Sequence, residues 1–169
     1  MDTTKVSIGG SSAGGNLAAV MAQRSATRGG PSFKIQYLIV PVTDNTASTQ
    51  TSDTYSKYEF TPALPAEKML WYRKHYLPKE EDWKDPEASP LLWEGDWGRL
   101  PHALVIVGEL DVLHGEGEQF ASRLKEAGVK ADLKVMNGMP HPFLAMDGVL
   151  NAGRLTITAI CEALEAAYK

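Results

Sequence analysis

The feature that most constrains the fold is a glycine-rich turn between a short apolar run and a stretch of helical period. Residues 10–14 read Gly-Ser-Ser-Ala-Gly, a G-x-S-x-G pattern with Ser12 at its centre. This is the pattern of a nucleophile elbow, in which the chain leaves a strand, turns sharply and enters a helix. Small residues two positions before and after the serine let the backbones pack closely. The free N–H groups of the helix N-terminus then favour negative charge beside the serine.

A glycine-rich turn between a strand and a helix can serve three purposes other than a nucleophile elbow. A phosphate-binding loop starting at Gly10 would need a lysine and a hydroxyl residue where Asn16 and Leu17 stand. A dinucleotide fingerprint needs G-x-G-x-x-G, and neither Gly9 nor Gly10 has a glycine two residues later. A glycine turn of purely structural use stays open on this pentapeptide, so the rest of the chain must supply the chemical partners.

The bulk properties fit one globular domain. The chain has 169 residues, 43% of them hydrophobic, and a formal net charge of −4. An acidic chain is a poor candidate for binding nucleic acid, which calls for a basic patch. No apolar run approaches the ~18 residues of a membrane span, and no signal peptide opens the sequence. We therefore expect a cytoplasmic protein without a membrane span.

Hydrophobic patterning predicts alternating strands and helices. This order indicates an α/β fold with a mostly parallel sheet and right-handed crossovers. Residues 44–56, rich in Thr, Ser and Asp, are expected to be loop. The predicted strands are 5–9, 35–40, 103–107 and 131–136, and the predicted helices are 13–25, 66–76, 116–127 and 152–167.

The sequence pattern also predicts where two sets of apolar residues on the helices lie. The aromatic residues of helix 66–76 either wall an acyl-binding pocket or pack on the domain, and the pattern favours packing. The single cysteine, Cys161, lies in an apolar stripe with Ile157, Ile160 and Leu164, which favours a place in the core over a chemical role.

Asp111 and His141 are the predicted partners of Ser12. Each follows a predicted strand, and ligands of open parallel sheets bind beyond the C-terminal ends of the strands. The chain order Ser, Asp, His is that of α/β-hydrolases. A hydroxyl becomes a good nucleophile when an imidazole takes its proton, and a carboxylate fixes the tautomer of that imidazole. The competing residues are His75, His102 and His114 for the base, and Asp96, Glu109, Asp132 and Asp147 for the acid.

These motifs resemble those of the hormone-sensitive-lipase-like, or fold-3, branch of the α/β-hydrolases. The resemblance extends over essentially the whole chain. It implies the α/β-hydrolase fold with Ser12 as nucleophile, Asp111 as acid, His141 as base and Ala13 as donor of one oxyanion N–H. The motifs that carry it are 8–18, Ser89-Pro90-Leu91, 108–113, Glu116-Gly117, 127–129 and His141-Pro142-Phe143.

The sequence departs from the family pattern at three points. Ser11 replaces the usual aspartate before the nucleophile, and Pro142 replaces the glycine after the base. The third departure is the family's H-G-G-G motif, which supplies further oxyanion donors upstream of the elbow and has no counterpart here. Residues 1–169 are therefore expected to be one catalytic domain truncated at its N-terminus, lacking the first strands and the cap. A complementary N-terminal segment or chain is the expected partner, and a homo-oligomer is the other possibility.

By this resemblance the protein is a serine hydrolase of short-to-medium acyl esters that uses no metal or organic cofactor. Two other kinds of protein stay open: a non-catalytic small-molecule receptor on the same fold, and an inactive fragment of an esterase. Lactonase, thioesterase and amidase reactions use the same three residues.

Overall fold

Four parallel strands form the centre of the computed structural model, which describes residues 5–169. They are β1 (Val6–Ser11), β2 (Phe33–Ile39), β3 (Ala103–Gly108) and β4 (Ala131–Met136). Within this sheet the strands follow the order β1-β2-β3-β4, and every neighbouring pair is parallel. The prediction of a parallel α/β sheet is therefore confirmed.

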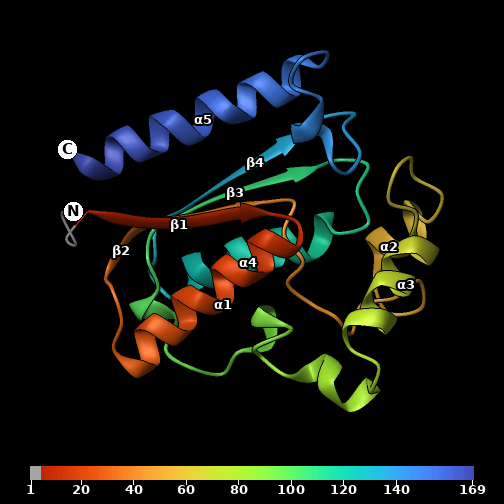
Figure 1. Ribbon diagram of the computed structural model, residues 1–169, viewed down its shortest axis with the longest axis horizontal. Helices are drawn as coiled ribbons and strands as arrows, with labels where there is room; N and C mark the ends of the chain where they lie inside the picture. Colours follow the sequence, from red (N-terminus) through yellow and green to blue (C-terminus); the bar gives the residue numbers. More distant parts are fainter. Residues whose placement is uncertain (1–4) are drawn as a thin grey trace.

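Helices cover both faces of the sheet (Figure 1). α1 (Ala13–Arg28) and α4 (His114–Glu126) lie on one face, and α5 (Asn151–Tyr168) lies on the other. α2 (Asp53–Lys57) and α3 (Ala66–Tyr76) stand beyond the C-terminal ends of the strands. Short 3-10 turns complete the chain at Glu80–Lys84, Pro90–Leu92, Trp97–Arg99 and Phe143–Met146.

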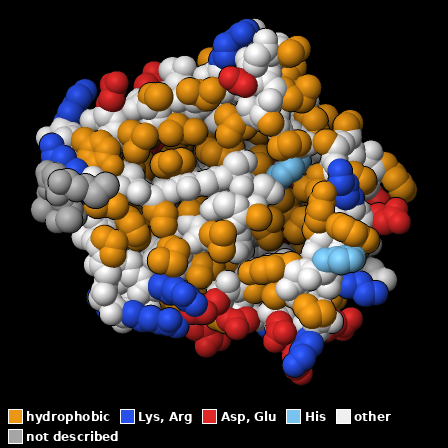
Figure 2. All heavy atoms as spheres, in the orientation of Figure 1, with side chains coloured by type: hydrophobic (Ala, Val, Ile, Leu, Met, Phe, Trp, Pro, Cys, Tyr) orange, Lys and Arg blue, Asp and Glu red, His pale blue; other side chains and the backbone are white. Residues whose placement is uncertain are grey.

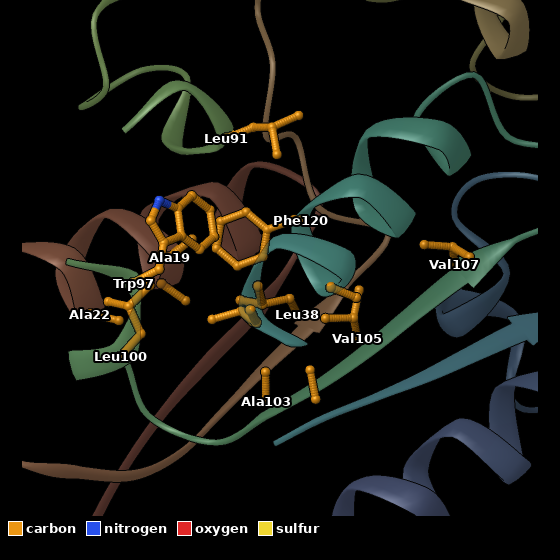
Figure 3. Close-up of a cluster of buried hydrophobic side chains, with 14 residues drawn as sticks. Ala19, Ala22, Leu38, Leu91, Trp97, Leu100, Ala103, Val105, Val107 and Phe120 are labelled. Carbon is orange, nitrogen blue, oxygen red and sulfur yellow. The ribbon is translucent and has the colours of Figure 1, made fainter. Parts of the chain in front are cut away.

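The strand residues alternate between two apolar cores because successive side chains of a strand point to opposite faces. Leu38 and Val105 face α1 and α4, where Phe120 and Trp97 pack edge to face with ring centroids 5.0 Å apart (Figure 3). Ile106 belongs to the cluster on the α5 side. Strands buried on both faces in this way are characteristic of parallel sheets.

β1 is the edge strand of the sheet formed by the described residues. It pairs only with β2, and all six of its residues are partly exposed. Figure 2 shows apolar side chains spread over the face that carries β1 and α1, with charged side chains gathered at the rim. An unpaired edge beside apolar surface is a template for another strand.

Three expectations differ from the structure. Part of the predicted loop 44–56 is the short helix α2, whose Tyr55 is buried. The α3 aromatics Tyr72 and Tyr76 do not pack in the core but stay about half exposed. Cys161 is exposed as well. α5 is apolar around much of its circumference, and the structure turns its small residues Gly153, Thr156 and Ala159 inward.

Candidate active site

Ser12 lies at the turn between β1 and α1, as the G-x-S-x-G pattern predicts. Its backbone has φ 57° and ψ −118°, a left-handed conformation that L-residues rarely adopt. The Ser12 N–H donates to the Ile39 carbonyl at 2.8 Å, and the Ser12 carbonyl accepts from the Asn16 N–H. The end of β2 and the first turn of α1 therefore hold the strained serine. Backbone strain of this kind costs about 1–3 kcal/mol and is typical of functional sites.

The first glycine of the pattern makes this turn sterically possible. A Cβ on Gly10 would lie 2.4 Å from the backbone carbon and oxygen of Gly14. A Cβ on Gly14 itself would meet nothing within 4 Å. The close backbone approach thus requires glycine before the serine, whereas the position after it has room for a Cβ.

Asp111 and His141 lie together, each in a loop that follows a strand. His141 Nδ1 is 2.8 Å from Asp111 Oδ2, and both side chains are almost fully buried. The other carboxylate oxygen, Oδ1, accepts from the Leu113 N–H at 3.0 Å. An ionised carboxylate only accepts hydrogen bonds, so Nδ1 carries the proton and Nε2 is left as the acceptor.

One cavity of about 590 Å³ joins Ser12 to His141. This size lies within the range of small-molecule sites. Among residues 5–169, Asp111 and His141 are in contact, but Ser12 and His141 form no hydrogen bond. Ser12 and His141 both line this cavity. The further lining residues are Ala13, Asn16, Leu17, Val42, Asn45, Ala63, Leu64, Lys68, Met69, Tyr72, Arg73, Tyr76 and Pro142.

Ala13 opens α1, and its N–H belongs to the first turn of the helix. Such N–H groups have no acceptor inside the helix and carry the positive end of its dipole. Ala13 also lines the cavity beside Ser12. Its N–H therefore lies beside Ser12, where the positive end of the helix dipole favours negative charge.

The competing histidines lie elsewhere. His75 is exposed on α3 and its ring packs on Trp71, and His102 meets Asp132 at the opposite ends of the strands. His114 pairs with Glu118 on α4. The alternative acid Glu109 accepts from the Gly138 N–H at 2.6 Å and so holds the loop that leads to His141.

Asn16 is a buried residue whose structural role the sequence patterns did not indicate. Its Nδ2 donates to the carbonyls of Val42 and Ala88, both at 2.8 Å. One side chain thus joins the elbow helix to the loop after β2 and to the loop before Pro90. The G-G-N motif marks Asn16 in the sequence, but its hydrogen-bond partners are distant in sequence, so no local pattern could identify them.

Glu116, which the sequence marks only as part of a motif, is a buried carboxyl. Its Oε1 accepts from the backbone N–H groups of Thr43 and Asp44, at 2.6 and 3.1 Å. Oε2 has no partner among the described residues. Burial raises the pKa of Glu116 well above its usual value, and the two backbone donors oppose that rise only in part.

Residues 5–169 hold no group of three or more His, Cys, Asp or Glu side chains that could bind a metal ion. None of their helices is both long and apolar enough to cross a membrane.

Comparisons with known proteins agree with this geometry. A family profile described as alpha/beta hydrolase fold matches residues 1–145. The chain is 43% identical to an AB hydrolase superfamily protein of Schizosaccharomyces pombe, over 99% of this chain and 50% of that protein. It is 37% identical to a carboxylic ester hydrolase of Mycobacterium tuberculosis, over 83% of this chain and 38% of that one. The chain thus spans half or less of the length of these relatives.

Solved structures show the same likeness. A thermostable carboxylesterase cloned from a metagenomic library superposes with a TM-score of 0.92 at 33% identity, covering 100% of this chain and 57% of that one. An esterase of Pyrobaculum calidifontis gives a TM-score of 0.90 at 36% identity, over 98% and 53%. The chain therefore belongs to the hormone-sensitive-lipase-like branch of the α/β-hydrolase family and corresponds to the C-terminal part of its members.

Proposed function

We propose that this chain carries the catalytic residues of a serine hydrolase that cleaves carboxylic esters of short-to-medium acyl chains. The observation that carries the proposal is one cavity that contains a strained serine and a histidine bound to a buried aspartate. The names of the relatives, which include a carboxylic ester hydrolase and an arylesterase, support the same reaction.

In the proposed reaction, His141 Nε2 takes the proton of Ser12 while Ser12 Oγ attacks the ester carbonyl. Asp111 holds the Nδ1 proton and stabilises the imidazolium that forms. The Ala13 N–H stabilises the developing oxyanion. His141 then gives its proton to the departing alcohol, leaving an acyl group on Ser12. Water, activated by His141, releases the acid and restores the serine, so no metal or organic cofactor is required.

We further propose that the free edge of β1 pairs with an N-terminal segment or chain that completes the sheet. The support is the unpaired edge of β1 and the length of the relatives, which is about twice that of this chain. Such a segment would also bring further oxyanion donors, and losing one donor typically costs about 10²–10³ in rate. Without it, the chain is expected to aggregate or self-associate. A stable monomer in sedimentation would contradict this proposal.

The experiment that tests the proposed function is covalent labelling with a fluorophosphonate, followed by intact mass and peptide mapping. The chain is used in its soluble form, alone or co-expressed with the segment that completes its sheet. The proposal expects one adduct, on Ser12, which is absent from Ser12→Ala and much slower to form in His141→Gln. Hydrolysis of 4-nitrophenyl butyrate should be lost in the same variants.

The alternatives give different outcomes. A non-catalytic receptor would bind small esters and show neither labelling nor turnover. An inactive fragment would show no labelling alone, but labelling would appear when the completing segment is present. Labelling at another residue would contradict the assignment of Ser12.

A further inference from the structure

Arg73 is a buried cation in the wall of the cavity that holds Ser12. It lies on α3 and follows Ala66 and Met69 along the stripe of that helix that faces the protein. Only 4% of its surface is exposed. Arginine is almost never buried to this extent without a partner, because taking an unpaired charge out of water is very costly.

The contacts of Arg73 solvate its charge but do not neutralise it. Nη1 donates to the carbonyls of Asn45 and Ala47, the latter at 2.7 Å, and the guanidinium lies over the Trp83 ring at 4.4 Å. Within residues 5–169 no carboxylate approaches it within 4 Å. Tyr55 first, and then Glu116 and Asp44, act on it through space and raise its pKa. Burial outweighs these neighbours and lowers the pKa of Arg73 from its usual value.

Part of the guanidinium is free to bind something else. Nε and Nη2 make no hydrogen bond within the described part of the chain, and neither is fully enclosed by protein atoms. Arg73 is one of the residues that line the Ser12 cavity. Free planar N–H donors beside a cavity are the arrangement that binds carboxylates in two-point contact.

The charges around the cavity have one sign. Arg73 and Lys68 line it, and no aspartate or glutamate of the described residues does. The remaining lining is largely apolar, and low polarity strengthens the attraction between opposite charges. A neutral alkyl ester would leave the free donors of Arg73 without an acceptor, whereas an anionic group on the ester would satisfy them.

We propose that this site prefers esters that carry a carboxylate, on the acyl or the alcohol part, and that Arg73 binds this carboxylate while Ser12 attacks the ester. The inference rests on the proposed esterase function and adds the class of substrate. Arg73 is a specificity residue in this scheme and takes no part in bond making.

The test compares pairs of esters in which one member carries a carboxylate in place of a methyl group or a ring hydrogen. On the acyl side the pair is the mono-4-nitrophenyl ester of suberic acid and 4-nitrophenyl octanoate. On the alcohol side it is 4-carboxyphenyl butyrate and phenyl butyrate. The wild-type chain is expected to show higher kcat/KM for the anionic member of at least one pair. In Arg73→Gln the ratio of anionic to neutral kcat/KM in that pair should fall by about 10- to 100-fold, the value of a hydrogen bond to a charged group.

Two variants separate recognition from structure. Arg73→Lys keeps the charge but loses the planar donors, so it should retain part of the preference. Lys74→Gln removes a charge from the exposed side of the same helix, outside the cavity, and should leave the ratio unchanged. If Arg73 only supports the loop at Asn45 and Ala47, Arg73→Gln will lower both rates equally, and the constant ratio will overturn the proposal.

Calorimetry on Ser12→Ala gives a readout that does not depend on turnover. The anionic member of a pair should bind about tenfold or more tightly than its neutral partner, and the additional Arg73→Gln change should remove the difference. Equal binding of both members in both pairs overturns the inference about charge. Both tests use the chain together with the segment that completes its sheet, and absence of Ser12 labelling and of all ester hydrolysis in that wild-type complex would instead overturn the proposed function.

Discussion

Replacing Gly10 by alanine should break the elbow, although the change adds a single methyl group. In the structure this Cβ would lie 2.4 Å from the backbone carbon and oxygen of Gly14, where ordinary contact begins at 3.4 Å. β1 and the start of α1 must therefore separate by about 1 Å, and no flexible side chain can absorb the shift. Overpacking a core costs about 1–3 kcal/mol and occasionally more. Because both sides of this contact are backbone, we expect a loss of about 3 kcal/mol.

The same movement should affect chemistry at Ser12. A displacement of about 1 Å at a reacting group can lower a rate by about 100-fold. The measurements are the free energy of unfolding in urea and the rate of fluorophosphonate labelling at Ser12. Gly10→Ala should lower both.

Gly14→Ala is the matched control within the same five residues. Its Cβ meets nothing within 4 Å, and alanine favours the helix over glycine by about 0.5–1 kcal/mol. This variant should unfold at the same or higher urea concentration and keep its labelling rate. If both variants lose stability equally, or if Gly10→Ala costs less than about 1 kcal/mol, the steric reasoning is wrong.

Three further predictions concern buried polar groups. Asn16→Ala leaves the buried Val42 carbonyl without its side-chain donor and should cost about 1–3 kcal/mol in urea unfolding; a cost under 0.5 kcal/mol would contradict the bridging role. Glu116 binds its proton more tightly folded than unfolded, so the stability this gives is present at low pH and is lost as the pH rises from the unfolded pKa of about 4.3 through the raised folded value. Glu116→Gln keeps an acceptor for Thr43 and should flatten that decline in urea titrations between pH 5 and 9; an unchanged slope would show that another group is responsible. Asp111→Asn should lower kcat for 4-nitrophenyl butyrate by about 10⁴-fold with little change in stability, because the amide no longer fixes the His141 tautomer. Full activity in that variant would exclude Asp111 as the acid.

The sequence predicted the fold because its signals are local. The G-x-S-x-G turn, the apolar runs of the strands and the glycines that end the helices each act within a few residues. The pairing of Asp111 with His141 could also be predicted, because parallel strands bring their C-terminal loops to one edge of the sheet. Catalysis at these residues stays a prediction, since Ser12 and His141 share a cavity without a hydrogen bond between them.

The errors arose where local pattern is ambiguous. α5 has apolar residues around much of its surface, so periodicity could not identify the buried face and placed Cys161 in the core. For the aromatics of α3 the pattern left a pocket wall and packing on the domain open and favoured packing, whereas Tyr72 and Tyr76 line the cavity. Which face of a helix is covered depends on the elements that pack against it, and no window of sequence contains them.

By itself, the sequence determined the order of strands and helices, the elbow at Ser12 and the candidate acid and base, because short-range sterics and hydrophobic period specify them. Only the tertiary structure decided what surrounds them. Asn16 donates hydrogen bonds to carbonyls 26 and 72 residues away in the sequence. Glu116 accepts a hydrogen bond from the loop after β2, 73 residues away. The tertiary structure also placed Arg73 in the wall of the Ser12 cavity. Contacts of this kind depend on which loops meet beyond the sheet, and that is fixed only when the whole chain packs.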